Sequence, residues 1–292
     1  QIEAVKPIAS DQKVCLLAFN KAIADELASK VPSSVHAKTI HALGLQCCHQ
    51  NVNKVTVDRN RVKVEEDIIE LYPKDQFEKM PNESSRAHNS RYHAMVASLR
   101  KFVSLTKNYG FRTVDIDSLG LIASTYDIPV QVTEETTQQI NTLLDCSFND
   151  TAFVDFDDMI WLPIVHGWKL PKYDLVGVDE AQDLNPLRQQ FVERVGNRTM
   201  VIGDSRQAIY GFCGADTKSM QTMRNSLAKR GKVTELPLNI TRRCPKSHVA
   251  IANSIFPGAL EAAPEAPEGT VGTSHLSNLI NTVQAQDFVL SR

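Results

Sequence analysis

Two groups of carboxylate and amide side chains follow short apolar runs in this sequence of 292 residues. The first, Asp179-Glu-Ala-Gln-Asp183, comes directly after an apolar run that ends at Val178. The second begins with Gly203 and Asp204, directly after Ile202. Carboxylates packed this densely at a buried strand end are costly unless they hold a cation or act as a base, and a nucleotide-bound Mg²⁺ is their natural partner. Taken alone, the first group also fits an ordinary acidic turn at the surface.

The residues after Asp204 have the chemistry to contact a phosphate and a base. Gln207 offers an amide that can sense a terminal phosphate or its attacking water. Tyr210 and Phe212 are flanked by glycines, which let the backbone approach a ligand, and exposed rings can stack on bases. A tight turn with two core aromatics is the alternative for this segment alone. The acidic strand end upstream favours the ligand-binding interpretation.

The elements that must position these residues alternate between strand and helix. The continuous apolar run at residues 14–19 is typical of a strand buried on both faces of a parallel sheet. Asn20 is a suitable N-cap for a helix that ends before Pro32. Further strands are predicted at residues 35–40, 174–178 and 199–202, with helices at 41–49 and 186–195. Ligands of such open sheets bind at the carboxyl ends of the strands, where both polar groups fall.

Residues 50–150 do not follow this alternation. They are more polar, contain prolines and show helical pieces at residues 65–71 and 90–106, which predicts an inserted, mainly helical domain. Near the carboxyl end, residues 261–269 have the composition of a linker. Two more strands are predicted after it, at residues 270–273 and 287–290.

Residues 84–113, the basic segment, contain no Asp or Glu and carry the aromatic residues Tyr92, Phe102, Tyr109 and Phe111. Its basic side chains are Arg86, Arg91, Arg100, Lys101, Lys107 and Arg112. A basic stretch with interleaved aromatics suits a phosphate backbone and unstacked bases. The alternative is a solvated helix face with core aromatics.

The composition is that of an ordinary soluble globular chain of about two domains, with 42% hydrophobic and 23% charged residues. The net charge of −2 argues neither for nor against nucleic acid. The longest purely apolar run, residues 14–19, is far shorter than the roughly 20 residues that cross a bilayer, so no membrane association is expected. The six cysteines form no C-x-x-C pair, which predicts reduced thiols rather than a zinc site.

Six segments, in order along the chain, resemble the motifs of a known family. They are Ala18-Phe-Asn-Lys-Ala22, Thr39-Ile-His41, Asp155-Phe-Asp157, Asp179-Glu-Ala-Gln-Asp183, residues 203–215 and Arg242-Arg-Cys-Pro245. Together they resemble a superfamily 1 helicase of the UvrD/Rep type, in its short, phage-like or Fbh-like branch. The resemblance implies an α/β fold: a RecA-like P-loop NTPase parallel sheet with an inserted mainly helical domain and the start of a second RecA-like domain. Residues 1–48 and 151–235 are then expected to form the first motor domain, 49–150 the helical insertion and 236–292 the beginning of the second.

The resemblance also implies roles at a nucleotide. Asp179 is expected to hold Mg²⁺ on ATP, and Glu180 to be the general base that orients and deprotonates the hydrolytic water. Gln207 is expected to sense the γ-phosphate, and Arg243 to stabilise the transferring phosphoryl group from the second motor domain. The expected ATP site is completed by Asp204 and Arg242.

At DNA, the resemblance implies contacts to the backbone from Asn20, Lys21, Thr39 and His41. Tyr210 and Phe212 are expected to stack on bases and slip past them during translocation. The segment Asp155-Phe-Asp157 is expected to be structural, where the chain returns from its insertion. The basic segment lies in that insertion, and the resemblance makes it more strongly expected to contact DNA.

The sequence departs from the family pattern at the phosphate-binding loop G-x-x-x-x-G-K-[ST], which is absent. The only Gly-Lys pair, Gly231-Lys232, has Ser226 in place of the first glycine and is followed by Val233. Without this loop, the chain alone is not expected to hydrolyse ATP. The loop is expected just before Gln1, and the later motifs of the second motor domain beyond Arg292, in a longer parent protein.

Two further departures concern single residues. Arg242 stands where relatives often carry an aromatic residue that stacks on adenine, and its guanidinium can stack instead. Cys213 stands where many relatives have an arginine that couples DNA to the ATP site. Coupling is then expected to be weaker, or to use Lys218 or Arg206.

The resulting hypothesis is an ATP-dependent DNA helicase or translocase that moves 3′ to 5′ on single-stranded or partly duplex DNA, with ATP and Mg²⁺ as cofactors. Two alternatives stay open. One is a non-catalytic DNA-binding protein with a helicase fold, and the other is the helicase module of a larger helicase-nuclease. The expected location is the cytoplasm for a bacterial or phage-encoded protein and the nucleus for a eukaryotic one.

Overall fold

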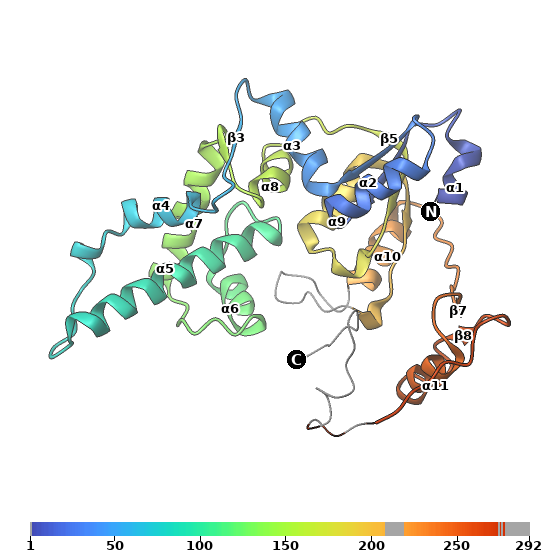
Figure 1. The fold of residues 1–292 in the computed structure, drawn as a ribbon. Helices are drawn as coiled ribbons and strands as arrows, with labels where there is room; N and C mark the ends of the chain where they lie inside the picture. Colours follow the sequence, from blue (N-terminus) through green and yellow to red (C-terminus); the bar gives the residue numbers. More distant parts are fainter. Residues whose placement is uncertain (1, 208–218, 274, 276, 278–292) are drawn as a thin grey trace. The chain divides into compact units, whose positions relative to one another are not determined.

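The computed structural model describes residues 2–207, 219–273, 275 and 277. The chain divides into two compact units, residues 1–232 and 233–292, which are described separately. The first unit contains a four-stranded parallel sheet with the strand order β2-β1-β5-β6, of which Figure 1 labels β5. Its strands are β1 (Val14–Ala18), β2 (Val35–Thr39), β5 (Tyr173–Val178) and β6 (Gly196–Val201). All four predicted strands of this region are confirmed.

The helices that connect these strands begin at capped residues. Asn20 caps α2 (Lys21–Lys30), where its Oδ1 accepts a hydrogen bond from the Ile23 N–H at 2.9 Å. Thr39 caps α3 (Ile40–Asn51) in the same way, and Asn185 caps α9 (Pro186–Val195). A cap satisfies one of the N–H groups that the first helical turn leaves without a partner. The predicted N-cap at Asn20 is therefore confirmed.

Alternate residues of β1 face opposite sides of the sheet, and all five are buried. Val14 and Leu16 pack in an apolar cluster with residues of α2, whereas Cys15 and Leu17 belong to a larger core with α3, α8 (Asp158–Val165) and α9. Gly44 permits the close approach of α3 to α8, because a Cβ at this position would lie 2.3 Å from the Met159 carbonyl oxygen. A strand covered by helices on both faces explains the uninterrupted apolar run.

The segment between the two halves of the sheet is mainly helical, as predicted. Its helices are α4 (Lys63–Leu71), α5 (Ser85–Asn108), α6 (Ile116–Thr125) and α7 (Glu134–Asn149) (Figure 1). The chain enters and leaves this region at a short parallel ladder between β3 (Thr56–Val57) and β4 (Phe153–Val154). Within the described residues, no helix combines the length and the apolar character needed to cross a bilayer.

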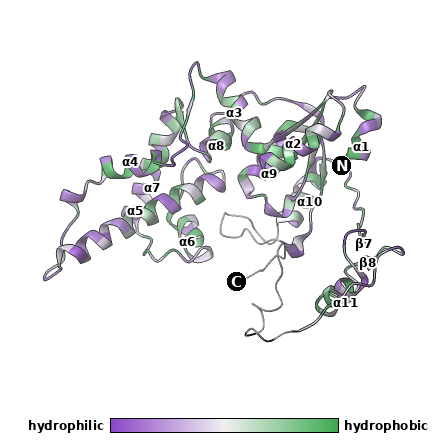
Figure 2. Ribbon diagram, viewed as in Figure 1, coloured by the Kyte–Doolittle hydropathy of each residue, from purple (hydrophilic) through white to green (hydrophobic). Residues whose placement is uncertain are grey.

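The basic segment largely forms α5, and its aromatic residues do not make an exposed stacking surface. Tyr92 and Phe102 are buried in the core, and Tyr109 stacks on Phe111 with both rings packed against it. Figure 2 shows hydrophilic and hydrophobic residues alternating along α5, as in a helix with one buried face. The solvated helix face with core aromatics is therefore the better description.

Most of the basic side chains of this segment have acidic partners elsewhere in the chain. Arg91 pairs with Glu83 at 2.9 Å, Arg100 with Glu65 at 2.8 Å and Arg112 with Asp145 at 2.6 Å. Lys107 is fully buried between carboxylates. The exposed basic side chains that could make the predicted DNA contact are Arg86, Lys101 and Arg100, and Arg100 is paired with Glu65.

The second unit contains β7 (Ile240–Thr241), α11 (Lys246–Ile255) and β8 (Glu261–Ala262). β8 pairs with β7 in parallel, so the predicted linker at residues 261–269 is wrong at its start. The predicted strand at residues 270–273 is not formed. Just before it, the carbonyl oxygens of residues 267 and 268 accept hydrogen bonds from the N–H groups of Lys246 and Ser247, which holds residues 267 and 268 against the start of α11. The predicted strand at residues 287–290 lies outside the described residues.

Candidate active site

The carboxyl ends of the four long strands lie at one edge of the sheet because the strands are parallel. Ala18 pairs with Thr39, and Leu17 pairs with Val178, so the segments that follow these strands start at the same level. Val178 also pairs with Val201 of β6. The structure therefore brings to one edge the predicted site residues Asn20, Lys21, Thr39, His41, Asp179, Glu180, Asp204 and Gln207.

Asp179 and Glu180 directly follow β5, next to the end of β1. The Asp179 N–H donates to the Leu17 carbonyl oxygen at 3.2 Å. Burial, and then the charge of Glu180, raise the pKa of Asp179. Glu180 adopts the left-handed conformation with φ 51° and ψ 43°, which costs a non-glycine residue about 1–3 kcal/mol. Strain of this kind often accompanies a functional position, because the surrounding structure must hold the residue there.

Gln182 contacts the Glu180 side chain, an interaction that the sequence did not reveal. Its Nε2 donates to Glu180 Oε2 at 2.6 Å, and its Oε1 accepts from the Asp204 N–H at 3.1 Å. The Gln182 residue is only 2% exposed. The only signal in the sequence was an amide within a segment predicted to lie at a buried strand end.

Asp204 and Gln207 lie at the end of β6 and contact each other. Gln207 Nε2 donates to Asp204 Oδ2 at 3.1 Å, and Arg206 Nε donates to Asp204 Oδ1 at 2.9 Å. Burial alone would raise the pKa of Asp204, but the hydrogen bonds from Arg206 and Gln207 outweigh it and lower the pKa. Tyr210, Phe212, Cys213 and Lys218 lie outside the described residues.

The acidic residues after β5 fit a Mg²⁺ ion that is carried in by a nucleotide. Burial and the charge of Glu180 raise the pKa of both Asp179 and Asp183, so a divalent cation would relieve the repulsion at this strand end. Among the described residues, no group of three or more His, Cys, Asp or Glu side chains could hold a metal on its own.

The other half of the edge carries the residues predicted to contact DNA. Asn20 and Thr39 are helix N-caps, and Lys21, the first residue of α2, is exposed. His41 lies edge-on to the Phe156 ring, with 5.9 Å between the ring centroids. Burial, and then the charge of Arg188, lower the pKa of His41 to about 4. His41 is therefore neutral at physiological pH and can donate a hydrogen bond without adding positive charge.

Two exposed phenylalanines at this edge had no assigned role. Phe19 is 37% exposed and Phe156 is 40% exposed. Phe19, His41 and Asp179 line one small pocket between the ends of β1 and β5. The two halves of the edge therefore border the same pocket.

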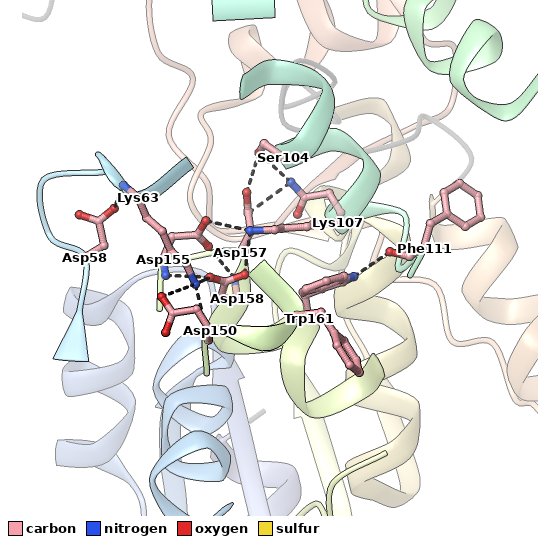
Figure 3. Close-up of polar contacts among 12 residues, drawn as sticks. Asp58, Lys63, Ser104, Lys107, Phe111, Asp150, Asp155, Asp157, Asp158 and Trp161 are labelled. Carbon is pink, nitrogen blue, oxygen red and sulfur yellow. Dashed lines mark hydrogen bonds and ion pairs between the residues drawn. The ribbon is translucent and has the colours of Figure 1, made fainter. Parts of the chain in front are cut away.

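Asp155 and Asp157, on either side of Phe156, belong to a buried polar cluster with Lys63, Lys107 and Asp158 (Figure 3). Lys107 Nζ lies 3.0 Å from Asp155 Oδ2 and 2.7 Å from Asp158 Oδ1. Ser104 Oγ donates to Asp157 Oδ2 at 2.6 Å. These contacts join α5 to the start of α8, so the two aspartates have the expected structural role.

Arg242 and Arg243 belong to the second unit, just after β7. The Arg242 guanidinium pairs with Glu265 at 2.7 Å, and the Arg243 N–H donates to Thr241 Oγ1 at 3.3 Å. Both residues are exposed. Their expected roles at the nucleotide remain predictions.

Comparison with known proteins identifies the fold. Residues 4–228 match the model of the family described as the UvrD/REP helicase N-terminal domain. The chain belongs to this family. Membership, together with the parallel sheet, confirms the predicted α/β, RecA-like fold and the resemblance to UvrD/Rep-type helicases.

Curated relatives of this UvrD/REP-type chain carry helicase names. It is 26% identical to the F-box DNA helicase protein 1 of Schizosaccharomyces pombe over 70% of this chain and 24% of the relative. It is 22% identical to the ATP-dependent DNA helicase PcrA of Staphylococcus epidermidis over 68% of this chain and 27% of the relative. A shorter match, 31% identical over 86 residues, is to the mitochondrial ATP-dependent DNA helicase HMI1 of Saccharomyces cerevisiae. The matched part of the chain spans about a quarter of the length of the first two relatives.

Proposed function

We propose that the protein containing this chain is an ATP-dependent DNA helicase or translocase that moves 3′ to 5′ along single-stranded DNA. One observation carries the proposal. The acidic pair Asp179 and Glu180 shares a sheet edge with the amino-terminal ends of α2 and α3, and Asp179 lines one pocket with His41 at the start of α3. This edge thus offers a place for a nucleotide beside a place for a phosphate backbone.

At the nucleotide, Asp179 would hold the Mg²⁺ that accompanies ATP. Glu180, held by Gln182, accepts the proton of the attacking water and orients it. Gln207 lies on the next strand end, where its amide can respond to the γ-phosphate. Arg243, in the second unit, is proposed to stabilise the charge on the transferring phosphoryl group. The bound Mg²⁺ would neutralise charge that develops on the phosphate oxygens.

At the DNA, two neighbouring helices present their amino-terminal ends. The first turns of α2 and α3 carry N–H groups that attract phosphate oxygens, and Lys21 adds a full positive charge. His41 contributes a neutral hydrogen-bond donor. Phe19 and Phe156 offer exposed rings for bases, in addition to the expected stacking on Tyr210 and Phe212.

We further propose that residues 1–292 alone do not hydrolyse ATP, because the sequence contains no G-x-x-x-x-G-K-[ST] loop. Such a loop provides the N–H groups and the lysine that hold the phosphates. Without these groups, the carboxylates of this edge lack the donors that bind the phosphates of ATP.

The proposal is tested by measuring ATP hydrolysis of the full natural protein with and without single-stranded DNA. We expect DNA to stimulate hydrolysis strongly, and Glu180→Gln to lower the turnover by orders of magnitude while nucleotide binding persists, because the base is lost and the shape is kept. Glu26→Gln, which changes an exposed carboxylate on α2 that pairs with Lys30, is the matched control and should leave turnover unchanged. Partial duplexes with a 3′ or a 5′ tail then test the direction.

The alternative functions predict different results. Tight DNA binding without hydrolysis by the wild-type protein would favour a non-catalytic DNA-binding protein.

For the DNA site, we expect the double variant Tyr210→Ala, Phe212→Ala to bind single strands more weakly, by about 1–3 kcal/mol per lost stack. Unchanged affinity in a fluorescence titration would contradict a stacking role for these rings.

A further inference from the structure

We propose that Gln182 is a positioning residue that holds the carboxylate of Glu180 and ties it to the segment after β6. The inference rests on the proposed function, because it takes Glu180 as the base for ATP hydrolysis. It goes further by assigning a role to a side chain that contacts neither the nucleotide nor DNA in that proposal.

The first step is the hydrogen bond from Gln182 Nε2 to Glu180 Oε2, which is short at 2.6 Å. Hydrogen bonds to a charged acceptor are shorter and stronger than those between neutral groups. The left-handed backbone of Glu180 points its side chain away from the ordinary course of the strand, but leaves the outer torsions of that side chain free. A buried amide donor removes this freedom and holds the carboxylate in one place.

The second step is the other end of the same amide. Gln182 Oε1 accepts from the Asp204 N–H at 3.1 Å, and Gly203 is packed so closely that a Cβ there would lie 2.4 Å from this oxygen. Because an amide group is planar and rigid, Glu180 and the main chain at Asp204 keep a fixed separation. The Ala181 N–H adds a second link, to the Ile202 carbonyl oxygen at 2.9 Å.

The consequence is mechanical. Residues 203–207 bear Gln207, which is proposed to respond to the γ-phosphate, and lead into the segment expected to stack on bases. A displacement of residues 203–207 moves the Asp204 N–H, and the Gln182 amide carries the movement to the carboxylate of Glu180. Gln182 therefore links the position of the base to the state of the β6 end.

Only a primary amide of this length makes both bonds. A glutamate at position 182 can still accept from the Asp204 N–H, but it presents an anion to Glu180 in place of a donor. A methionine fills a similar volume and makes neither bond. These two substitutions separate the donor function from the packing function.

The experiment compares Gln182→Glu and Gln182→Met with Gln189→Met in the full natural protein. Gln189 is the matched control because it is also buried and its Nε2 donates two hydrogen bonds, to the Leu184 carbonyl oxygen at 3.0 Å and to Ser219 Oγ at 2.9 Å, neither of which involves Glu180. DNA-stimulated ATP hydrolysis gives kcat and KM, and thermal unfolding gives the stability of each variant.

We expect both Gln182 variants to lower kcat by about 10²-fold, as a misplaced catalytic group does, with little change in the KM for ATP. Gln182→Glu buries a second carboxylate beside Glu180 and should lose stability as well as kcat, whereas Gln189→Met should lose stability and keep its kcat. Full kcat in Gln182→Met, or an equal loss in Gln189→Met, overturns the inference while the proposed function stands. A wild-type protein that hydrolyses no ATP overturns the proposed function and the inference together.

Discussion

Replacing Lys107 tests whether the buried polar cluster holds the helical insertion to the sheet. Lys107 is fully buried on α5, and its ammonium lies 2.7–3.0 Å from the carboxylates of Asp158 and Asp155 (Figure 3). Burial opposes its positive charge, but the two carboxylates outweigh burial and raise the pKa of Lys107. Lys107→Met keeps the length of the side chain and removes the charge, which leaves the aspartates with Lys63 as their remaining cation.

The magnitude follows from burial. Removing one partner of a buried ion pair costs about 3–5 kcal/mol, because the other charge stays in the interior without compensation. Arg100, on the same helix, provides the matched control: it pairs with Glu65 at 2.8 Å, but the two side chains are 50% and 43% exposed. An exposed pair contributes about 0–1 kcal/mol, so Arg100→Met should have a several-fold smaller effect.

Urea unfolding followed by tryptophan fluorescence measures both variants. Trp161 and Trp168 both lie in the first unit, and Trp161 is itself buried against Lys107 with 5.5 Å between the ammonium and the ring centroid. A Lys107→Met variant that loses no more stability than Arg100→Met would refute the reasoning. If Lys107→Met does not fold, adding Asp155→Asn should restore folding, because it removes the charge left without its partner.

Three further predictions concern pH, packing and DNA. Burial and the neighbouring carboxylate of Asp155 raise the pKa of Asp157 from 3.8 to about 6, so the folded state keeps a proton that the unfolded chain releases. The stability of the folded state should therefore fall as the pH rises from about 4 to 6. Asp157→Asn should flatten this change, as measured by the melting temperature at each pH. Gly203→Ala places a Cβ 2.4 Å from the Gln182 oxygen and should slow ATP hydrolysis by the full protein, whereas Gly120→Ala, with open space around it, should not. Lys21→Ala should lower the salt dependence of DNA binding by about one phosphate contact, as measured by titrations at several salt concentrations; an unchanged slope would place the backbone elsewhere.

The sheet and its polar edge could be predicted because their signals are local. Residues 14–18 form an apolar run that is typical of a strand covered on both faces, and Asn20 marks the start of the next helix by its own chemistry. Parallel strands then place their carboxyl ends together without further information. This is why Asp179 and Asp204, far apart in the sequence, were correctly expected at one edge.

The short strands near the carboxyl end could not be predicted in the same way. β7 and β8 contain two residues each, too few for any periodicity to show. β8 also lies at the start of a segment rich in proline and glutamate, a composition that favours a linker. Its pairing with Ile240 and Thr241 is a long-range contact, which a local pattern does not contain.

Whether the basic segment binds DNA could not be predicted from its local sequence either. Its window of sequence contains no acid, but the acids that pair with Arg100, Lys107 and Arg112 come from α4, α8 and α7 or their flanks. A helix with a buried face must neutralise any cation that falls on that face, and the partner can lie anywhere in the chain. Basic residues interleaved with aromatics therefore look alike in sequence whether they face DNA or the core. The exposure of each ring separates the two cases: Phe102 has none, whereas Phe156, which lies in no basic run, is 40% exposed beside the capped helix ends.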